Sequence, residues 1–242
     1  MSRLQETRSV HTRGLDDFSI YKYVIPSEAL VYAIMTGNVT EVRHLARLGA
    51  DISSTDSWIV YEACLHGREM MQAMMLNEAL NVNPALPGQM GDTVFHFLLR
   101  TPSPRFADSK AEVIKSILVS GIQPWERDRL GNTALHILAT SELQGDQDGY
   151  GIMKLLLDHK PQIPVHITSR FRAIIDAPNE HGNSPLLLAA LHNNLRCLQL
   201  LLDNGACPNV KGQFNKTPLF FARSRGYVEI AELLTRYRAT MD

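Results

Sequence analysis

Thr217-Pro218-Leu219-Phe220-Phe221-Ala222 decides the fold of this chain, because a close copy lies 217 − 184 = 33 residues upstream, at Ser184-Pro185-Leu186-Leu187-Leu188-Ala189. Two further copies open with a Thr-x-x-His pattern at Thr133 and Thr93, and two weaker ones start near residues 28 and 58. Self-similarity at a fixed period of about 20–50 residues is typical of proteins built from stacked repeats. The sequence therefore predicts one repeated unit stacked along the chain.

Each copy is predicted to form two short helices. A Thr or Ser before the first apolar residue can cap the free N–H groups of a helix's first turn. Pro185 and Pro218 fit the next position, since a helix makes no backbone bond there. The small side chains of Ala189 and Ala222 let paired helices approach closely. Gly226 suits the positive φ at which a first helix ends.

These features resemble the ankyrin repeat, which has a period of about 33 residues and a T-P-L-H-x-A opening. The resemblance implies an all-α solenoid of about six helix-turn-helix repeats with short hairpin-like tips, starting near residues 28, 58, 93, 133, 184 and 217. It places the repeat domain at residues 27–242. Residues 1–26 match no repeat and are expected to be an N-terminal extension, flexible in its first half, whose second half caps the first repeat.

Two spacings depart from the period. The step from 93 to 133 is 40 residues and the step from 133 to 184 is 51. The extra residues are expected near 100–111, 141–151 and 160–178, and the middle stretch, which contains Gln144-Gly145-Asp146-Gln147-Asp148-Gly149, is predicted to be a polar loop. Long insertions often carry function, so these segments are candidates for partner-specific features.

Composition narrows the function. The net charge is −1, with 24 Lys and Arg against 25 Asp and Glu, so no overall basic field favours direct nucleic-acid binding. No run of about 18 apolar residues predicts a membrane span. Three scattered cysteines, Cys64, Cys197 and Cys207, favour a reducing compartment. We therefore expect a monomer of the cytoplasm or the nucleus.

The sequence predicts neither enzyme chemistry nor a metal or cofactor site. His96 and His136 invite a catalytic or metal reading, but neither has a His or Cys companion at metal-ligand spacing. They occupy the family position at which the resemblance implies an imidazole that bonds backbone between repeats. Cys64 and Cys197 are expected to be buried and Cys207 to be more exposed. No phosphate-binding or nucleophile-elbow motif occurs.

The resemblance implies that partners bind on a concave face made by the tips and the first helices. Large apolar side chains recur at two positions facing that groove. The position four residues after each repeat start holds Tyr32, Glu62, Phe97, Ile137, Leu188 and Phe221, and the position before the tip glycine, or before Asn215, holds Met90, Leu130, His181 and Phe214. Trp125, near the base of one hairpin, is expected to extend this apolar set, and Arg127 and Arg129, in the tip of that hairpin, are expected to contribute to partner specificity.

Two interpretations stay open at this stage. In one, these side chains are exposed and bind an extended segment or an amphipathic helix of another protein. In the other, the insertions or neighbouring repeats cover them. The leading function is a non-enzymatic scaffold, adaptor or inhibitor that binds a protein. The alternative is the substrate-recruiting region of a larger enzyme, or a regulatory subunit of a transcription or chromatin complex.

Overall fold

The structure, a computed structural model, describes residues 26–50, 58–76, 93–101, 110–119, 124–141, 147–159 and 173–241. Within these ranges all regular secondary structure is helical, and the helices come in contacting pairs. The pairs are α2 (Pro26–Met35) with α3 (Val39–Arg47), α4 (Ile59–Leu65) with α5 (Arg68–Met74), α6 (Val94–Arg100) with α7 (Lys110–Val119), α8 (Ala134–Thr140) with α9 (Gln147–Asp158), α11 (Pro185–Leu191) with α12 (Leu195–Asp203), and α13 (Pro218–Ser224) with α14 (Val228–Arg236). A short 3-10 turn, η6, covers Gln213–Asn215.

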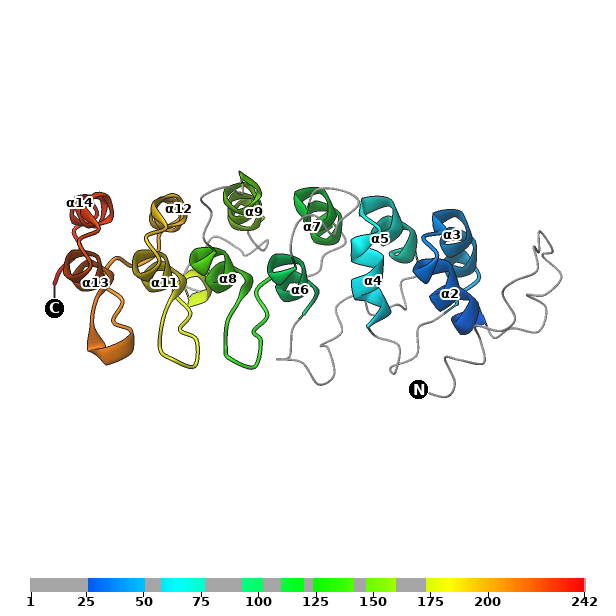
Figure 1. The fold of residues 1–242 in the computed structure, drawn as a ribbon, viewed down its shortest axis with the longest axis horizontal. Coiled ribbons are helices and arrows are strands. Elements are labelled where there is room, and N and C mark those ends of the chain that lie inside the picture. Colours follow the sequence, from blue (N-terminus) through cyan, green and yellow to red (C-terminus); the bar gives the residue numbers. More distant parts are fainter. Residues whose placement is uncertain are drawn as a thin grey trace, which may run out of the picture.

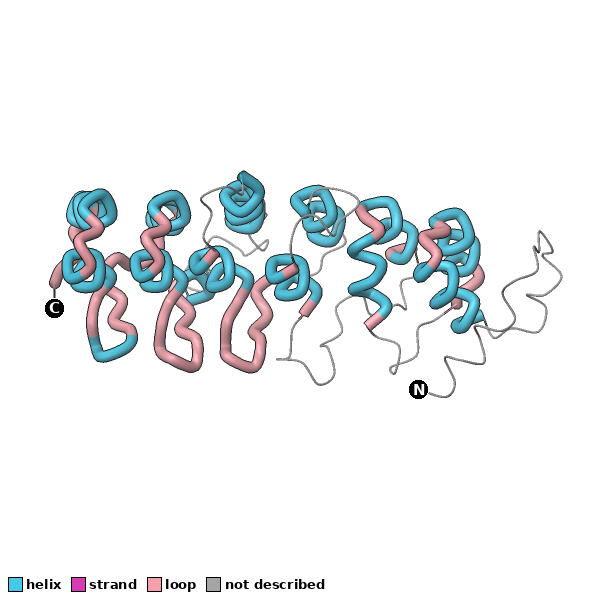
Figure 2. The backbone as a smooth tube through the Cα atoms, in the orientation of Figure 1, coloured by secondary structure: helices cyan, strands magenta, loops and turns pink. Residues whose placement is uncertain are grey.

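The pairs stack side by side into an elongated solenoid, which confirms the predicted all-α fold with about six repeats (Figure 1). We number the repeats 1–6 in chain order. The first helices form one row and the second helices a parallel row. The tips that the structure describes project from the first-helix row, away from the second helices (Figure 2). Tips and first helices together therefore make one continuous side of the molecule.

The first helices of the later repeats begin at the predicted caps. The Ser184 hydroxyl accepts a hydrogen bond from the backbone N–H of Leu187, and the Thr217 hydroxyl accepts one from Phe220, both at 3.3 Å. Pro185 and Pro218 follow as the first helical residues. Each cap satisfies an N–H group that the helix leaves unpaired, so the sequence fixes where each tip ends and each helix starts.

The core lies between the two helix rows and between neighbouring repeats. It is made of apolar side chains from both rows, including the fully buried Ile34, Phe95, Leu135 and Leu201. A single pair cannot bury its apolar face alone, so stability comes from stacking, as in other repeat proteins. The first helices of the inner repeats are consequently packed between those of their neighbours.

The reversals between paired helices use the conformation that the sequence predicts. Gly37 and Gly226 both have φ of +72°, and Asn193, which takes the glycine's place in repeat 5, has φ of +55°. At Gly37 a side chain would also be crowded, because a Cβ atom would lie 3.1 Å from Nδ1 of His66 in the next repeat. Glycine there meets a backbone need and a packing need together.

One element differs from the prediction. Residues Gln147, Asp148 and Gly149 do not belong to a polar loop; they form the first turn of α9. Helix α9 buries Ile152, Met153 and Leu156 against its neighbours, and its helical path extends back to Gly149, which is itself buried. The remaining insertion residues, 102–109, 142–146 and 160–172, lie outside the described ranges, as do residues 1–25, for which the cap stays a prediction.

Candidate protein-interaction surface

Three tips are described in full. We call residues 126–132 tip 4, residues 177–183 tip 5 and residues 210–216 tip 6. In tips 4 and 5 the chain reverses with a backbone bond across the base, from the N–H of Asp128 to the carbonyl of Asn132 at 2.9 Å and from that of Asn179 to that of Asn183 at 3.0 Å. A single glycine with positive φ closes each turn, Gly131 in tip 4 and Gly182 in tip 5.

Asp128 organises tip 4 from inside. Its Oδ1 atom accepts hydrogen bonds from the N–H groups of Leu130 (2.9 Å) and Asn132 (2.8 Å). Its Oδ2 atom lies 2.6 Å from a guanidinium nitrogen of Arg100 in the preceding repeat. Burial by itself raises the pKa of Asp128, but the hydrogen bonds from Arg100 and Asn132 outweigh it and leave the pKa below its usual value. The carboxylate therefore stays ionised and holds the tip to repeat 3.

Tip 5 repeats this arrangement with an amide. The side-chain oxygen of Asn179 accepts hydrogen bonds from the N–H groups of His181 and Asn183, each at 3.0 Å. Its amide group donates to the side-chain oxygen of Asn132 in tip 4 at 2.9 Å. The N–H of Glu180 also donates to the Leu130 carbonyl at 3.0 Å. Neighbouring tips 4 and 5 are thus bonded to each other as well as internally.

Buried imidazoles connect each first helix to the following tip. Nδ1 of His96 accepts a hydrogen bond from the backbone N–H of Thr93 (3.2 Å), and its Nε2 lies 2.8 Å from the carbonyl oxygen of Asn132. Because Nδ1 is the acceptor, Nε2 carries the proton and donates it to that carbonyl. His136 makes the same pair of bonds, with Nε2 3.1 Å from the Asn183 carbonyl oxygen. The inter-repeat role predicted for both histidines is confirmed.

Neither ring nitrogen of His136 is open for proton transfer. Burial lowers its pKa to about 4, and the hydrogen bond to the Asn183 carbonyl only partly opposes that effect. The imidazole is therefore neutral near pH 7, with one nitrogen donating and the other accepting. A group held in this way is a structural bridge.

Tip 6 is built differently. Leu187 stands where His96 and His136 stand in earlier repeats, and Gly212 stands where Asp128 and Asn179 stand. A Cβ atom on Gly212 would lie 2.0 Å from Cδ2 of Leu187. The leucine side chain thus occupies the space next to the tip, and only glycine fits beside it. Tip 6 has consequently lost both the imidazole bridge and the side-chain acceptor that organise tips 4 and 5.

The backbone of tip 6 differs as well. Phe214 and Asn215 both have positive φ, +59° and +58°. Asparagine tolerates this conformation, as predicted, but a residue with a bulky side chain pays roughly 1–2 kcal/mol for it. Phe214 is also 76% exposed. It therefore combines an unfavourable backbone with an aromatic ring that faces solvent, a combination that points to a functional position.

The predicted residues of the first-helix row are less exposed than a row of partner-binding side chains requires. Tyr32 is exposed, Glu62, Phe97, Ile137 and Phe221 are half-buried, and Leu188 is buried in the core. Phe97 packs edge-to-face on Tyr61 of the preceding repeat, with ring centroids 4.8 Å apart. Phe221 packs in the same way on Phe220 at 5.6 Å. A neighbouring repeat thus covers part of Phe97, a residue of the same helix covers part of Phe221, and Leu188 offers a partner little surface.

The predicted residues of the tips are more accessible. Leu130, His181, Phe214, Arg127 and Arg129 are exposed. The guanidinium of Arg127 donates to the carbonyl of Pro178 at 2.9 Å and so connects tips 4 and 5. Trp125 is half-buried against the core, and Met90 lies outside the described residues.

The sequence-based prediction missed two cationic side chains of tip 6. Lys211 is exposed, and Lys216 lies with Nζ 4.6 Å from the ring centroid of Phe220. Alignment at the repeat period would have found them, because Lys211 takes the place of Arg127, and Lys216 directly follows the tip Asn215. We define the tip surface as Arg129, Leu130, His181, Lys211, Phe214 and Lys216.

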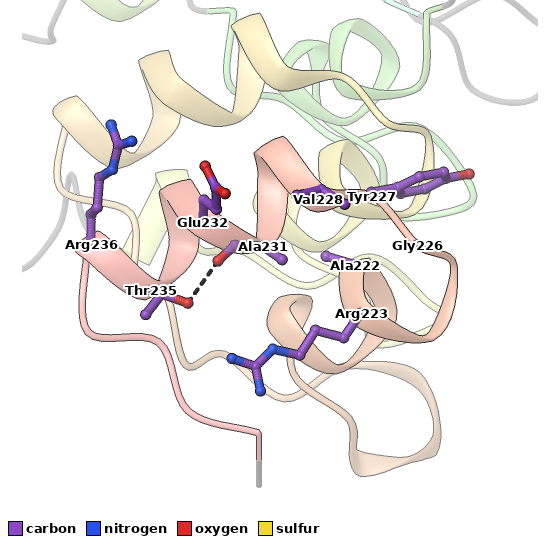
Figure 3. Close-up of a pocket in the computed structure, with 9 residues that line it drawn as sticks. All are labelled: Ala222, Arg223, Gly226, Tyr227, Val228, Ala231, Glu232, Thr235 and Arg236. Carbon is purple, nitrogen blue, oxygen red and sulfur yellow. Dashed lines mark hydrogen bonds between the residues drawn. The ribbon is translucent and has the colours of Figure 1, made fainter.

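A hollow lies on the outer side of repeat 6 (Figure 3). It is lined by α13 and α14, on residues that correspond to buried stacking positions of repeat 5. Thirty-three residues apart, Arg223 replaces Ala190, Ala231 replaces Leu198 and Thr235 replaces Leu202. The Thr235 hydroxyl donates to the Ala231 carbonyl at 2.7 Å. This face is polar where inner stacking faces are apolar, and it brings together no nucleophile and base.

Groups suited to other chemistry are not assembled in the described ranges. Those ranges contain no cluster of three His, Cys, Asp or Glu side chains able to hold a metal ion. Burial raises the pKa of Cys64, and that of Cys197 to about 12, so neither thiol is a ready nucleophile. Cys207 is half-exposed. No described helix is both long and apolar enough to cross a bilayer.

Comparison with known proteins identifies the family. The model of the family "Ankyrin repeats (3 copies)" matches residues 105–212 and 149–242, together more than half of the chain. The chain is 42% identical over 65 residues to putative ankyrin repeat protein YahD of Escherichia coli K12, covering 25% of this chain and 32% of that protein. It is 28% identical over 167 residues to the nuclear factor NF-kappa-B p105 subunit of Gallus gallus, covering 69% of this chain and 14% of that protein.

A solved structure, the ankyrin repeat domain of Bcl-3, superposes with a TM-score of 0.66 at 23% identity, covering 88% of this chain and 86% of that one. This similarity shows the fold alone. The chain spans about a third or less of the length of the curated relatives named above. From the matching family model, the repeat period and the stacked helix pairs, the chain belongs to the ankyrin-repeat family.

Proposed function

We propose that this chain is a protein-interaction module that binds a segment of another protein along the tip surface and the first-helix row of repeats 4–6. Ankyrin repeats are in general modules of protein–protein interaction. The observation that carries the proposal is Phe214, a strained aromatic residue that leaves 76% of its surface in solvent. Large exposed apolar groups on a folded surface mark partner sites, and aromatic anchors supply much of the binding energy.

Neighbouring side chains extend this anchor into a continuous contact. Leu130 is exposed at the equivalent place of tip 4, and the half-buried Ile137 and Phe221 lie behind the tips on α8 and α13. Burying each large apolar side chain contributes about 1.5–3 kcal/mol before the costs of association. A segment that crosses three repeats therefore has enough apolar contact for specific binding.

The biological role proposed is that of a monomeric, non-enzymatic scaffold, adaptor or inhibitor in the cytoplasm or the nucleus, without direct nucleic-acid binding. A second role is favoured by one observation. The matched region is 4% of tankyrase from Caenorhabditis elegans and 16% of the tyrosine-protein kinase Shark from Drosophila melanogaster. Regions of this kind therefore occur within larger proteins, and the alternative role is recruitment of a substrate to an enzyme or a transcription complex.

The test is affinity capture from cells with the wild-type chain beside the double variant Leu130→Ser/Phe214→Ser. Both positions are exposed, so the variant is expected to keep its helical content and its unfolding midpoint. Partners of the tip surface are expected to be depleted at least about tenfold in the variant, since two apolar anchors are lost. Quantitative mass spectrometry of the captured proteins gives the ratio.

The matched control is Val119→Ser/Val228→Ser. These valines are 82% and 65% exposed, and they lie on the second-helix row. The control removes apolar surface from the opposite side of the solenoid and is expected to capture the same partners as the wild-type chain. Equal capture by all three proteins, or losses only in the control, would place binding elsewhere and overturn the proposal.

A further inference from the structure

We propose that the segment bound at the tip surface is acidic and carries an aliphatic or aromatic anchor between its carboxylates. This inference rests on the proposed function and adds the chemistry of the partner. Three observations support it: the division of charge between the two sides of the solenoid, the surroundings of Phe214, and an unfilled backbone hydrogen-bond donor in tip 6.

Charge is divided between the two sides although the chain is nearly neutral overall. The first helices of repeats 4–6, α8, α11 and α13, contain no Asp or Glu and one cation, Arg223. The second helices α9, α12 and α14 carry more acids than bases, namely Asp148, Asp158, Asp203, Glu229 and Glu232 against Lys154, Arg196 and Arg236. The tips carry the cations Arg127, Arg129, Lys211 and Lys216 against the exposed Glu126 and Glu180. Asp128 does not add to the exposed acids, because it is buried and paired with Arg100.

The positive side chains of the tip surface are available. Among the residues that the structure describes, no ion pair involves Arg129, Lys211 or Lys216. Opposite charge across an interface sets partner choice and speeds association. A cationic surface on a chain of net charge −1 therefore favours a segment that carries local negative charge.

Phe214 stands within this charged surface. Lys211 precedes it by three residues and Lys216 follows it by two. Lys216 also lies over the ring of Phe220 at 4.6 Å, which keeps its cation close to the aromatic cluster of α13. An apolar anchor of the partner would contact the Phe214 ring while its carboxylates reach the flanking ammonium groups.

Tip 6 offers a backbone donor that tips 4 and 5 use internally. In tip 4 the N–H groups of Leu130 and Asn132 donate to Asp128. The corresponding groups of tip 6 belong to Phe214 and Lys216, and Gly212 has no side chain to accept from them. The N–H group of Lys216 closes the 3-10 turn η6 instead, while no residue that the structure describes accepts from the N–H group of Phe214. A carboxylate is the strongest acceptor that a partner can bring to such a group.

A protein segment fits this surface better than a nucleic acid. Apolar side chains, Leu130 and Phe214, alternate with the cations, and Glu126 and Glu180 interrupt the positive charge. A phosphate backbone would meet these carboxylates with like charge and would leave Leu130 without an apolar contact. Phosphate binding relies mainly on the number of cations, and that number is small here.

The test uses random 12-residue peptides displayed on phage, selected on the purified full chain. The enriched peptides are expected to carry net negative charge and at least one large apolar residue, and fluorescence anisotropy of the synthetic peptides measures their affinity. The variant Arg129→Glu/Lys211→Glu is expected to lower that affinity at least about tenfold and to flatten its dependence on salt. The matched variant Lys115→Glu/Lys154→Glu, with both positions exposed on second helices, is expected to bind like the wild-type chain.

The outcomes separate this inference from the proposed function. Enriched peptides that are neutral or basic but still lose affinity for Phe214→Ser would overturn the acidic partner and leave the interaction site in place. Peptides insensitive to both Phe214→Ser and the tip charge reversal would overturn both proposals. Tighter binding of a 20-nucleotide single-stranded DNA than of any selected peptide would replace the protein segment by a nucleic acid.

Discussion

We call the contact between a first helix and the tip of the next repeat a joint. The joints between repeats 3 and 4 and between repeats 4 and 5 are polar, whereas the joint between repeats 5 and 6 is apolar. In the earlier joints a buried imidazole, His96 or His136, reaches across to the next tip, and Asp128 or Asn179 organises that tip from within. In the last joint Leu187 fills the same space with carbon, and Gly212 leaves room for it. In the polar joints side-chain hydrogen bonds organise the tips. In the apolar joint, Phe214 and Asn215 lie at positive φ in a tip that keeps only the backbone bonds, from the N–H of Gly212 to the Lys216 carbonyl and from that of Asn215 to the Gly212 carbonyl.

This difference shows that repeats of one fold can serve different roles, some giving structural stability and others presenting a binding residue. Polar bridges hold tips 4 and 5 in place, because the buried side chains of His96, His136 and Asp128 are hydrogen-bonded. The last joint gives up that network, and the strained aromatic residue lies on the less tethered tip. Strain of this kind persists only where surrounding structure or function maintains it. The predictions below test whether the two kinds of joint really differ.

The largest effect is expected from His136→Ala. The substitution removes a buried ring and leaves the Thr133 N–H and the Asn183 carbonyl without their partner, which costs about 3–4 kcal/mol in free energy of unfolding. Urea unfolding followed by circular dichroism at about pH 7.5 measures the loss. The control is His181→Ala, at an exposed tip position, which is expected to change stability by less than about 0.5 kcal/mol. Equal effects of the two variants would show that the imidazole bridge does not support the joint.

Acid should weaken the same joint. Burial lowers the pKa of His136 from 6.5 to about 4, so the unfolded chain binds this proton more readily than the folded one. The stabilising contribution is complete above about pH 6.5 and is lost as the pH falls towards about 4. Between about pH 7.5 and pH 5 the loss from this residue is about 2 kcal/mol.

Unfolding free energies measured across that pH range test the point. The variant His136→Leu imports the residue type of Leu187 and removes the titrating group. It is expected to start from a lower stability but to lose about 2 kcal/mol less than the wild-type chain on acidification. A pH profile parallel to that of the wild-type chain would mean that His136 does not titrate in the way its burial implies.

The fold was accessible from the sequence because its signals are local and repeated. Thr93, Thr133, Ser184 and Thr217 begin first helices wherever the pattern places them, and Asn193 and Asn215 adopt the positive φ predicted for glycine substitutes. The start of α9 was missed, because Gln147-Asp148-Gly149 carries a loop composition and becomes helical through packing of the residues that follow.

The candidate site was predictable only in part. Sequence position placed Leu130, His181 and Phe214 at successive tips, and the structure describes all three there as exposed. It could not show that neighbours bury Leu188 or that Tyr61 covers part of Phe97, since both depend on how closely adjacent repeats approach. The strain at Phe214 was equally hidden, because nothing in the sequence marks a phenylalanine at this position for positive φ.

Placing the polar residue types of the earlier joints between repeats 5 and 6 tests whether the two kinds of joint differ. Gly212→Asn alone is expected to destabilise the chain, because its Cβ would approach Cδ2 of Leu187 to 2.0 Å. Leu187→His alone buries an imidazole without an organised tip. The double variant is expected to recover about 1 kcal/mol relative to the sum of the single changes, because the leucine side chain that would clash with the new asparagine is no longer there. A double-mutant cycle in urea measures this coupling, and hydrogen exchange at the N–H group of Phe214 should slow. Strict additivity would show that the two residue choices are unrelated.

The smallest effect, and the one that bears most on function, is expected from Phe214→Asn. Asparagine accepts positive φ more easily than phenylalanine, so the free energy of unfolding should rise by about 0.5–1 kcal/mol. The same change removes the exposed ring, so binding of selected peptides should weaken. Phe214→Leu is the matched control, because it retains an apolar side chain and the backbone strain and should leave stability within about 0.5 kcal/mol of the wild-type value. If asparagine at position 214 raises the free energy of unfolding and lowers peptide affinity, then the phenylalanine is there for binding and not for stability. If Phe214→Asn lowered stability and left peptide affinity unchanged, the ring would instead be part of the fold, and the contrast between tip 6 and the earlier tips would have no functional meaning.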